Sequence, residues 1–499
     1  MNKRCWLGIG IVVGSLLLGC AGDEERNRTG EKRARVACLA EQTKYQDWPA
    51  LKMTNGIITV VAVPDIGGRV MVYDLNGRSL LYTNPKEYGQ VYEVAQKEQD
   101  RKWHNWGGYK VWPAPQKDWG GPPDPLGSAL DSGQWTGEIL SAEGSKVAIR
   151  LTSPEDKTVT GLQMSRTLTL FRGSSRVQVE QTFKNVSDKP VRWSVWDVTQ
   201  VPGALSEGET FTEEARIYFP LNPQSRHPQG YEVQAGEKES KQWLKGVAPG
   251  IMGVQYLRET GKIGADSLGG WIAYADQRHK VVYVKTFQVE TGEQVEYPDN
   301  GSTVEVYTSG DLPYMEVEVL SPIRELQPGE SYTFTENWYA ATCPGPILAV
   351  NEVGLVNTPL TAQSLENTVR LRGTFGVFQE GKASFAFYDQ EGQLLARTGA
   401  VEVSPLETWA LDQVVKLPDD AVRVKVLLES HDRVELGTLA EATLEAAPPE
   451  EPAQTVQETA TTPPAPEPTA PSPENLPPSE PTEEQEPAAP PPPEAAPSG

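Results

Sequence analysis

The sequence predicts an all-β protein, with a large β-sandwich followed by a small one. Beyond about residue 45 almost every apolar segment is short, rich in Val, Ile, Thr, Tyr and Trp, and bounded by Gly, Pro, Asn or Asp, as strands are. No segment shows convincing 3.6-residue periodicity, which excludes a parallel α/β fold with its crossover helices. Strand segments recur at short spacing over about 300 residues, and such a run predicts a two-sheet sandwich or barrel.

Residues 1–19 are predicted to be a lipoprotein signal. Two basic residues precede an apolar run from Trp6 to Leu18, which is the layout of an export signal and is short for a membrane span. The run ends in Leu17-Leu18-Gly19-Cys20, which resembles the lipobox of bacterial lipoproteins, where the signal is cut before the cysteine and the thiol carries diacylglycerol. An ordinary signal peptide is the alternative. We expect Cys20 to anchor the chain at a membrane of a bacterial cell envelope.

The segments that flank the predicted fold differ from it in composition. Ala21 follows the cysteine, and since an Asp there would resemble the inner-membrane retention signal of Gram-negative bacteria, Ala is compatible with the outer membrane. Residues 20–44 are charged and short of apolar side chains, which predicts a tether. Residues 446–499 hold 18 of the 42 prolines and no aromatic residue, which predicts a disordered acidic tail. The net charge of −23 argues against a nucleic acid partner.

The large domain is predicted over residues 45–345, and a hairpin is its sharpest element. Asn76-Gly77 joins a strand over residues 70–75 to one over residues 78–83, because Asn-Gly supplies the positive φ of a type I′ turn. Further strands are predicted over residues 147–151, 164–171, 177–183, 191–198, 271–275, 281–289, 304–307, 315–320 and 332–339.

A second, smaller domain is predicted over residues 350–445. Pro344-Gly345-Pro346 interrupts the run of strands, and a new group begins near Val369. Its clearest strands are residues 383–388 and 422–428, with a turn at Gln390-Glu391-Gly392. The length fits a single Ig-like β-sandwich.

The four cysteines leave two for the folded part of the chain. Cys5 departs with the signal and Cys20 is expected to be lipidated, so Cys38 and Cys343 remain in an oxidising compartment. They are a candidate disulfide that would close a long loop. Two unpaired buried thiols are the alternative.

The motif search excludes several kinds of chemistry and leaves the tryptophans. The chain has no HExxH, no CxxC pair, no Gly-rich phosphate loop and no GxSxG, so we expect no metal and no cofactor. Five of the 13 Trp fall between Trp103 and Trp135, in a stretch dense with Gly and Pro. Indole faces stack on the apolar faces of sugars, which favours a carbohydrate site on this long loop region. Packing of the loop over one sheet is the alternative.

Several segments carry a resemblance to a known family. Gly67-Gly68-Arg69-Val70, residues 103–116 (WHNWGGYKVWPAPQ) and residues 193–200 (WSVWDVTQ) look like an uncharacterised bacterial domain family related to galactose mutarotase, and residues 314–322 and 326–330 look like its closing strands. The resemblance covers about residues 45–342. It implies a galactose-mutarotase-like (aldose 1-epimerase-like) β-supersandwich.

The resemblance also implies where a catalytic pair would lie. Mutarotases use a Glu and a His as base and acid. His104 before Gly107-Gly108, and Glu293 before Tyr297-Pro298-Asp299, match their positions. Where mutarotases have a second histidine, this chain has Trp193 and Trp196. A hydrogen-bonded loop histidine and a solvated carboxylate are the alternatives for His104 and Glu293.

Together these observations predict a lipid-anchored envelope protein that binds carbohydrate. Binding is favoured over turnover, and the alternatives are a sugar epimerase or glycan-processing enzyme using His104 and Glu293, and a structural protein of the envelope or cell wall. The predicted carbohydrate-binding residues are Arg69, Trp103, Trp106, Tyr109, Trp112, Trp196, Gln200 and Asp299. For Arg69 the alternative to sugar binding is a structural ion pair.

Overall fold

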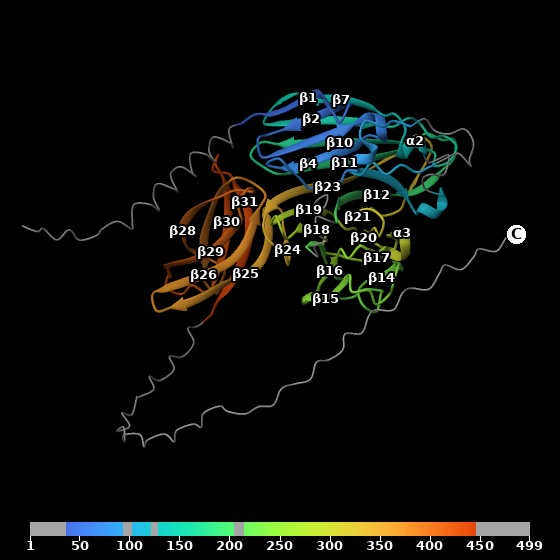
Figure 1. Ribbon diagram of the computed structural model, residues 1–499. Helices are drawn as coiled ribbons and strands as arrows, with labels where there is room; N and C mark the ends of the chain where they lie inside the picture. The colour runs from blue at the N-terminus through green and yellow to red at the C-terminus, as the bar shows by residue number, and fades with distance from the viewer. Residues whose placement is uncertain (1–35, 93–101, 121–127, 204–213, 446–499) are drawn as a thin grey trace, which may run out of the picture. The chain divides into compact units, whose positions relative to one another are not determined.

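The computed structural model describes residues 36–92, 102–120, 128–203 and 214–445. The predicted signal, Cys20 and the tail over 446–499 lie outside these ranges. The described residues belong to one compact unit and form an almost entirely β structure, as predicted (Figure 1). None of the described helices is long and apolar enough to cross a membrane.

Within the described ranges, 13 strands form the first sheet of the large sandwich. Their order is β14-β17-β20-β21-β12-β6-β4-β3-β2-β1-β8, with β22 beside β12 and β5 beside β4. The strands are β1 (Cys38–Tyr45), β2 (Trp48–Thr54), β3 (Ile58–Val63), β4 (Arg69–Leu75), β5 (Arg78–Ser79), β6 (Tyr109–Ala114), β8 (Glu143–Gly144), β12 (Val191–Pro202), β14 (Glu232–Ala235), β17 (Gly261–Ala265), β20 (Val304–Thr308), β21 (Tyr314–Leu320) and β22 (Arg324–Leu326).

The second sheet has ten strands in the described ranges, ordered β15-β16-β13-β18-β19-β23-β11-β10-β9-β7. These are β7 (Thr136–Ser141), β9 (Lys146–Thr152), β10 (Leu162–Phe171), β11 (Val177–Asn185), β13 (Ala215–Pro220), β15 (Trp243–Ala248), β16 (Ile251–Gln255), β18 (Trp271–Asp276), β19 (Val281–Phe287) and β23 (Ser331–Thr342). Each strand predicted in the large domain has a counterpart, but the one expected over residues 78–83 is confined to Arg78–Ser79. In β10 buried and half-buried residues alternate over the whole strand, because one face meets the core and the other meets solvent.

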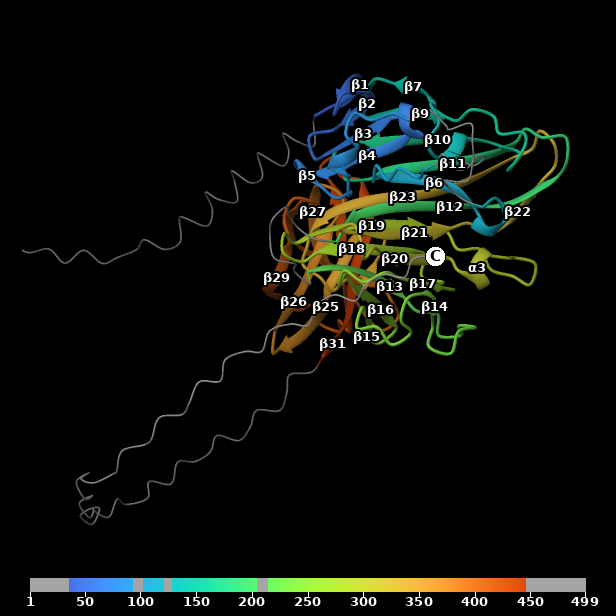
Figure 2. The same ribbon diagram turned by 45° about the vertical axis from the view of Figure 1, so that its right-hand side comes forward.

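The two sheets pack face to face around one continuous core (Figure 2). Aromatic rings join them: Tyr73 of β4 contacts Tyr283 of β19 at 5.5 Å between centroids, and Tyr109 of β6 contacts Trp338 of β23 at 4.6 Å. A polar network also crosses the core, in which Lys285 of β19 is paired with Asp197 of β12. Both side chains are fully buried, and burial lowers the pKa of Lys285 to about 8.

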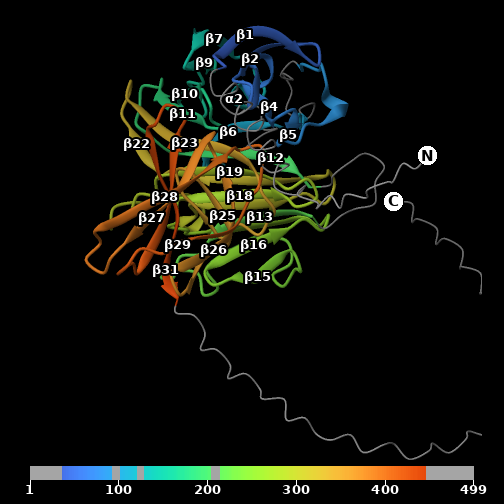
Figure 3. The ribbon, with the colours of Figure 1, turned by 90° about the vertical axis from the view of Figure 1, so that its left-hand side faces the viewer.

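The small domain is a second sandwich with a core of its own (Figure 3). Its strands, in the order β28-β27-β30-β31-β25-β26-β29 with β24 beside β25, are β24 (Ala349–Val350), β25 (Gly354–Leu365), β26 (Thr368–Val377), β27 (Gly381–Tyr388), β28 (Leu394–Val403), β29 (Trp409–Lys416), β30 (Arg423–Ser430) and β31 (Glu435–Glu445). A further cluster joins it to the second sheet of the large sandwich, where Tyr339 stacks on Phe378 with centroids 4.3 Å apart.

The predicted hairpin is confirmed, and two other predictions need correction. Asn76 and Gly77 have φ of 51° and 82°, as a type I′ turn requires. The tether predicted over residues 20–44 is too long, because β1 begins at Cys38 and pairs with β2 from Leu39 to Tyr45.

The predicted disulfide between Cys38 and Cys343 is wrong. Both cysteines are free and buried. Cys38 belongs to the core of the large sandwich, whereas Cys343 belongs to the cluster between the two sandwiches. Burial raises the pKa of the Cys38 thiol to about 11 and that of the Cys343 thiol to about 12, so neither is a reactive thiolate near neutral pH.

Candidate functional site

Charged and aromatic side chains gather on one face of five adjacent strands, β17, β20, β21, β12 and β6. Residues directly opposite each other in a sheet project from the same face. Glu305 is opposite Glu318, and Tyr307 is opposite Glu316, whose other neighbour is Gln200. We call this surface the charged face; its residues are Lys110, Trp112, Trp196, Gln200, Lys262, Glu305, Tyr307, Glu316 and Glu318.

Lys262 is the centre of the charged face. Its Nζ lies 2.7 Å from Glu305 Oε2 and 3.1 Å from Glu318 Oε2. The ammonium also lies 4.5 Å from the ring centroid of Trp196, whose indole N–H donates to Glu318 Oε2 at 2.7 Å. Both carboxylates are fully buried, while 19% of the Lys262 side chain stays exposed. One partly accessible cation is therefore held over two buried acids.

Burial and charge shift the proton affinities of this group in opposite ways. Burial raises the pKa of Glu318 to about 8, against the lowering effect of Lys262. Burial lowers the pKa of Lys262, but Glu318 and Glu305 outweigh it, and the net shift is upward. At neutral pH Lys262 is therefore charged, while Glu318 largely keeps its proton.

A second charged pair lies beside the first. Lys110 Nζ lies 3.0 Å from Glu316 Oε1, and the same oxygen accepts from Gln200 Nε2 at 2.9 Å. The Lys110 ammonium lies 4.5 Å from the Trp112 ring and 5.9 Å from the Trp103 ring. The Trp103 side chain is 36% exposed, which is unusual for an indole and leaves a ring available to a ligand.

The turn that precedes β20 brings a further carboxyl group to the charged face. Asp299 and Asn300, in α3 (Pro298–Gly301), have left-handed φ of 47° and 59°, which strains non-glycine residues. The Asn300 side chain holds the turn by donating to Glu232 Oε2 at 3.1 Å. Burial, and then Glu305, raise the pKa of Asp299 to about 6. A carboxyl group that titrates there can hold or release a proton near neutral pH.

Three of the predicted sugar-binding residues are structural instead. Arg69 is 1% exposed and pairs with Asp131 at 2.7 Å, so the ion-pair alternative is correct. Trp106 is buried and donates to the carbonyl of Gln90, and Tyr109 lies between the two sheets. None of the three has the exposure that contact with a ligand in solvent requires.

The other predicted residues lie on or beside the charged face. Trp112, Trp196 and Gln200 are buried in it and hold Lys110, Lys262 and Glu316 through the contacts given above. Trp103 and Asp299 are accessible at its edges.

The predicted catalytic pair is not joined in the described part of the chain. His104 Nδ1 lies 3.6 Å from Glu87 Oε1, and its ring stacks on Tyr92 with centroids 3.5 Å apart. Glu293 is exposed in the segment between β19 and α3. No hydrogen bond or ion pair among the described residues links His104 to Glu293, and their role as acid and base stays a prediction.

Sequence reasoning missed the acids and lysines that centre the charged face. Glu316 and Glu318 alternate with Met315, Val317 and Val319 along one strand, and this pattern shows that one face of that strand is charged. The described residues hold no cluster of three or more His, Cys, Asp or Glu arranged for a metal ion.

The stability of the protein is expected to fall as pH rises from about 5 to about 8. Glu318 has an ordinary pKa of 4.5 and a pKa of about 8 in the fold, so between these values the folded state binds more protons than the unfolded state. The charged groups that face Glu318 are Lys262, Glu305 and Glu316, and all three remain in the variant Glu318→Gln. Urea unfolding across this range should show a shallower pH slope for Glu318→Gln than for the parent, with exposed Glu155→Gln as the control. An unchanged slope in Glu318→Gln would contradict the assignment.

Comparison with solved structures finds galactose mutarotase-like and aldose 1-epimerase-like proteins. The chain is similar to a TPR-domain containing protein from Parabacteroides distasonis, with 13% identity over 61% of this chain and 49% of that chain and a TM-score of 0.39. It is similar to a galactose mutarotase-like protein from Clostridium acetobutylicum (12% identity, 61% and 99% covered, TM-score 0.39). It is also similar to a putative aldose 1-epimerase from Klebsiella pneumoniae (13% identity, 60% and 82% covered, TM-score 0.38). The chain spans about half the length of the Parabacteroides protein.

The family assignment rests on the sequence. No curated protein matches the chain. Residues 49–341 match the family described as "Domain of unknown function (DUF4380)", which covers the large sandwich from β2 almost to the end of β23. The expected resemblance to an uncharacterised domain family is confirmed. The chain therefore belongs to the DUF4380 family, whose function is unknown.

Proposed function

We propose that the protein binds carbohydrate on the charged face of the large sandwich. The observation that carries the proposal is the placement of accessible polar groups beside an exposed indole. Lys262, Tyr307, Glu316 and Asp299 are each partly exposed, and the Trp103 ring lies within reach of the Lys110 ammonium on the same surface. Sugars present hydroxyls that donate and accept hydrogen bonds together with apolar C–H faces that stack on indoles.

The electrostatics of the charged face suit a ligand without strong charge. Each lysine is already paired with a carboxylate, Lys262 with Glu305 and Lys110 with Glu316. A strongly anionic ligand would face these acids, and a cationic ligand would face the lysines. Paired ions still accept and donate further hydrogen bonds, as hydroxyl recognition requires.

The partner and location predicted from the sequence stay part of the proposal. The binding surface would be held at a bacterial envelope membrane by the lipidated Cys20, with a glycan as the partner. The charged tether and the proline-rich tail would act as spacers on either side of the two sandwiches.

The variant Glu316→Gln tests the proposal most directly. This carboxylate is partly exposed and receives Lys110 and Gln200, so its neutral isostere keeps the shape and removes the charge-assisted acceptor. We expect the affinity for a bound sugar to fall about tenfold or more, measured by a glycan array and by titration calorimetry with the full chain.

The matched control is Glu325→Gln, an exposed glutamate on β22. It should leave the affinity unchanged. Equal binding by parent and Glu316→Gln would contradict the proposal, and so would the absence of binding by the folded parent across a broad glycan panel.

A further inference from the structure

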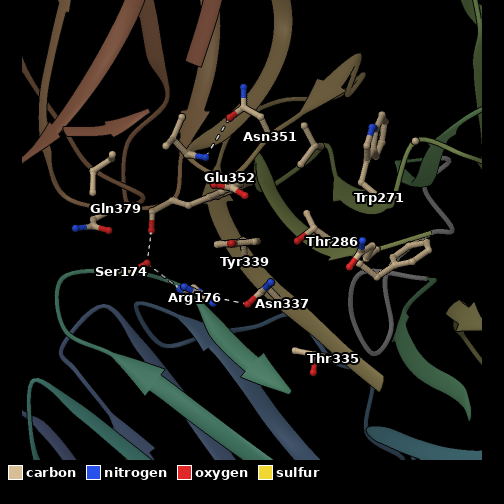
Figure 4. Close-up of a pocket in the computed structure, with 18 residues that line it drawn as sticks. Ser174, Arg176, Trp271, Thr286, Thr335, Asn337, Tyr339, Asn351, Glu352 and Gln379 are labelled. Atoms are coloured by element: carbon tan, nitrogen blue, oxygen red, sulfur yellow. Dashed lines mark hydrogen bonds between the residues drawn. The ribbon is translucent and has the colours of Figure 1, made fainter. Parts of the chain in front are cut away.

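A cavity of about 740 Å³ lies between the second sheet of the large sandwich and the small sandwich (Figure 4). Its walls come from β18, β19 and β23 on one side and from the segments around Asn351 and Gln379 on the other. We propose that this cavity is a second carbohydrate site, which takes a neutral saccharide and is distinct from the charged face. Its volume falls within the range of ordinary small-molecule sites.

The apolar part of the lining is aromatic. Trp271 stands at one side of the cavity and Tyr339 at its centre, as Figure 4 shows. Tyr339 is fixed by its stack on Phe378, with an interplanar angle of 17°. Trp271 is 6% exposed and Tyr339 is 5% exposed, so each rigid ring offers a sugar the part of its apolar surface that borders the cavity, at little cost in conformational entropy.

The polar part of the lining is made of amides and hydroxyls. Arg176 Nε donates to Asn337 Oδ1 at 2.8 Å, which turns the amide oxygen of Asn337 toward the guanidinium and its NH₂ group away from it. Within the described residues neither that NH₂ nor the side chain of the half-buried Gln379 makes a hydrogen bond to another side chain or carbonyl. The lining therefore offers both donors and acceptors, which is what adjacent sugar hydroxyls need.

The charge of the lining points to a neutral ligand. It contains one cation, Arg176, and one anion, Glu352. An anionic ligand would meet the guanidinium but also the carboxylate, whereas a neutral polyol can hydrogen-bond to both.

The cavity is built from a fixed contact between the two sandwiches. Ser174 Oγ donates to the carbonyl of Phe378 at 2.9 Å, and Ser175 N donates to the same carbonyl at 2.9 Å. These bonds hold the segment that carries Gln379 against the large sandwich. None of the residues of the charged face lines this cavity, so the two proposals stand on different side chains.

Titration calorimetry of the full chain with maltose, cellobiose, lactose and chitobiose tests the proposal. We expect at least one of these disaccharides to bind at millimolar concentration or below. Gln379→Ala and Trp271→Phe should each weaken that binding about fivefold or more, by loss of an amide partner and of indole surface. Gln393→Ala, an exposed glutamine of the small sandwich outside the cavity, is the matched control and should bind as the parent does.

The two sites are separated by comparing variants. Binding that survives Glu316→Gln and is weakened in Gln379→Ala supports the cavity, whatever the outcome for the charged face. Binding weakened only in Glu316→Gln supports the charged face and overturns the cavity proposal. Absence of binding by all four disaccharides also overturns it. Because Trp271 is largely buried, the Trp271→Phe result is used only if the melting temperature of this variant stays near that of the parent. If it does not, Gln379→Ala alone decides the test.

Discussion

Lys262→Met is expected to lower the free energy of unfolding by about 3–5 kcal/mol. The substitution keeps the length of the side chain and removes the ammonium that lies 2.7 Å from Glu305 Oε2 and 3.1 Å from Glu318 Oε2. The fully buried Glu305 carboxylate then remains without its cation, and a buried charge left alone costs far more than a surface pair contributes. Urea unfolding of the purified full chain at neutral pH measures the loss.

A matched comparison makes the Lys262 result specific. Lys245→Met removes an exposed lysine paired with Glu239 and should leave the free energy of unfolding close to that of the parent, because solvent screens that pair. A loss below about 1 kcal/mol at neutral pH would show that Lys262 does not neutralise its buried acidic partner.

The strands could be predicted because their signal is local. Leu162–Phe171 alternates buried and half-buried side chains along its whole length, which follows from the two-residue period of a strand with one face on a core. The Asn76-Gly77 turn is likewise fixed by backbone preferences of the two residues themselves. Local rules of this kind hold regardless of where the rest of the chain goes.

The charged face could not be predicted in the same way, because it depends on the order of strands in the sheet. Strand β12 lies between β21 and β6, so Glu316, Gln200 and Lys110 meet although they are far apart in sequence. Lys262 comes from a further strand, β17. The alternating acids of β21 show a polar face, but no sequence pattern shows which cations it meets.

The burial of individual tryptophans also could not be predicted, because it depends on how the chain packs. Trp106 and Trp112 occur in the same aromatic loop region as Trp103, and composition alone gives all three the same expectation. Burial separates them: the first two are covered, and each indole N–H has an internal acceptor, Gln90 O and Asp131 Oδ1. Only Trp103 keeps a substantially exposed ring.

Arg69→Met is expected to lower the free energy of unfolding by about 3–5 kcal/mol while leaving sugar affinity unchanged in the molecules that remain folded. The Arg69 guanidinium lies 2.7 Å from Asp131 Oδ1, and both side chains are almost completely buried. Its removal leaves that carboxylate with the Trp112 indole as its remaining side-chain donor among the described residues. Arg78→Met, at an exposed position in the adjacent hairpin, is the matched control and should stay within about 0.5 kcal/mol of the parent. If Arg69→Met instead kept the parent's stability and lost sugar binding, Arg69 would be a ligand-binding residue, and the ion pair would not be its main role.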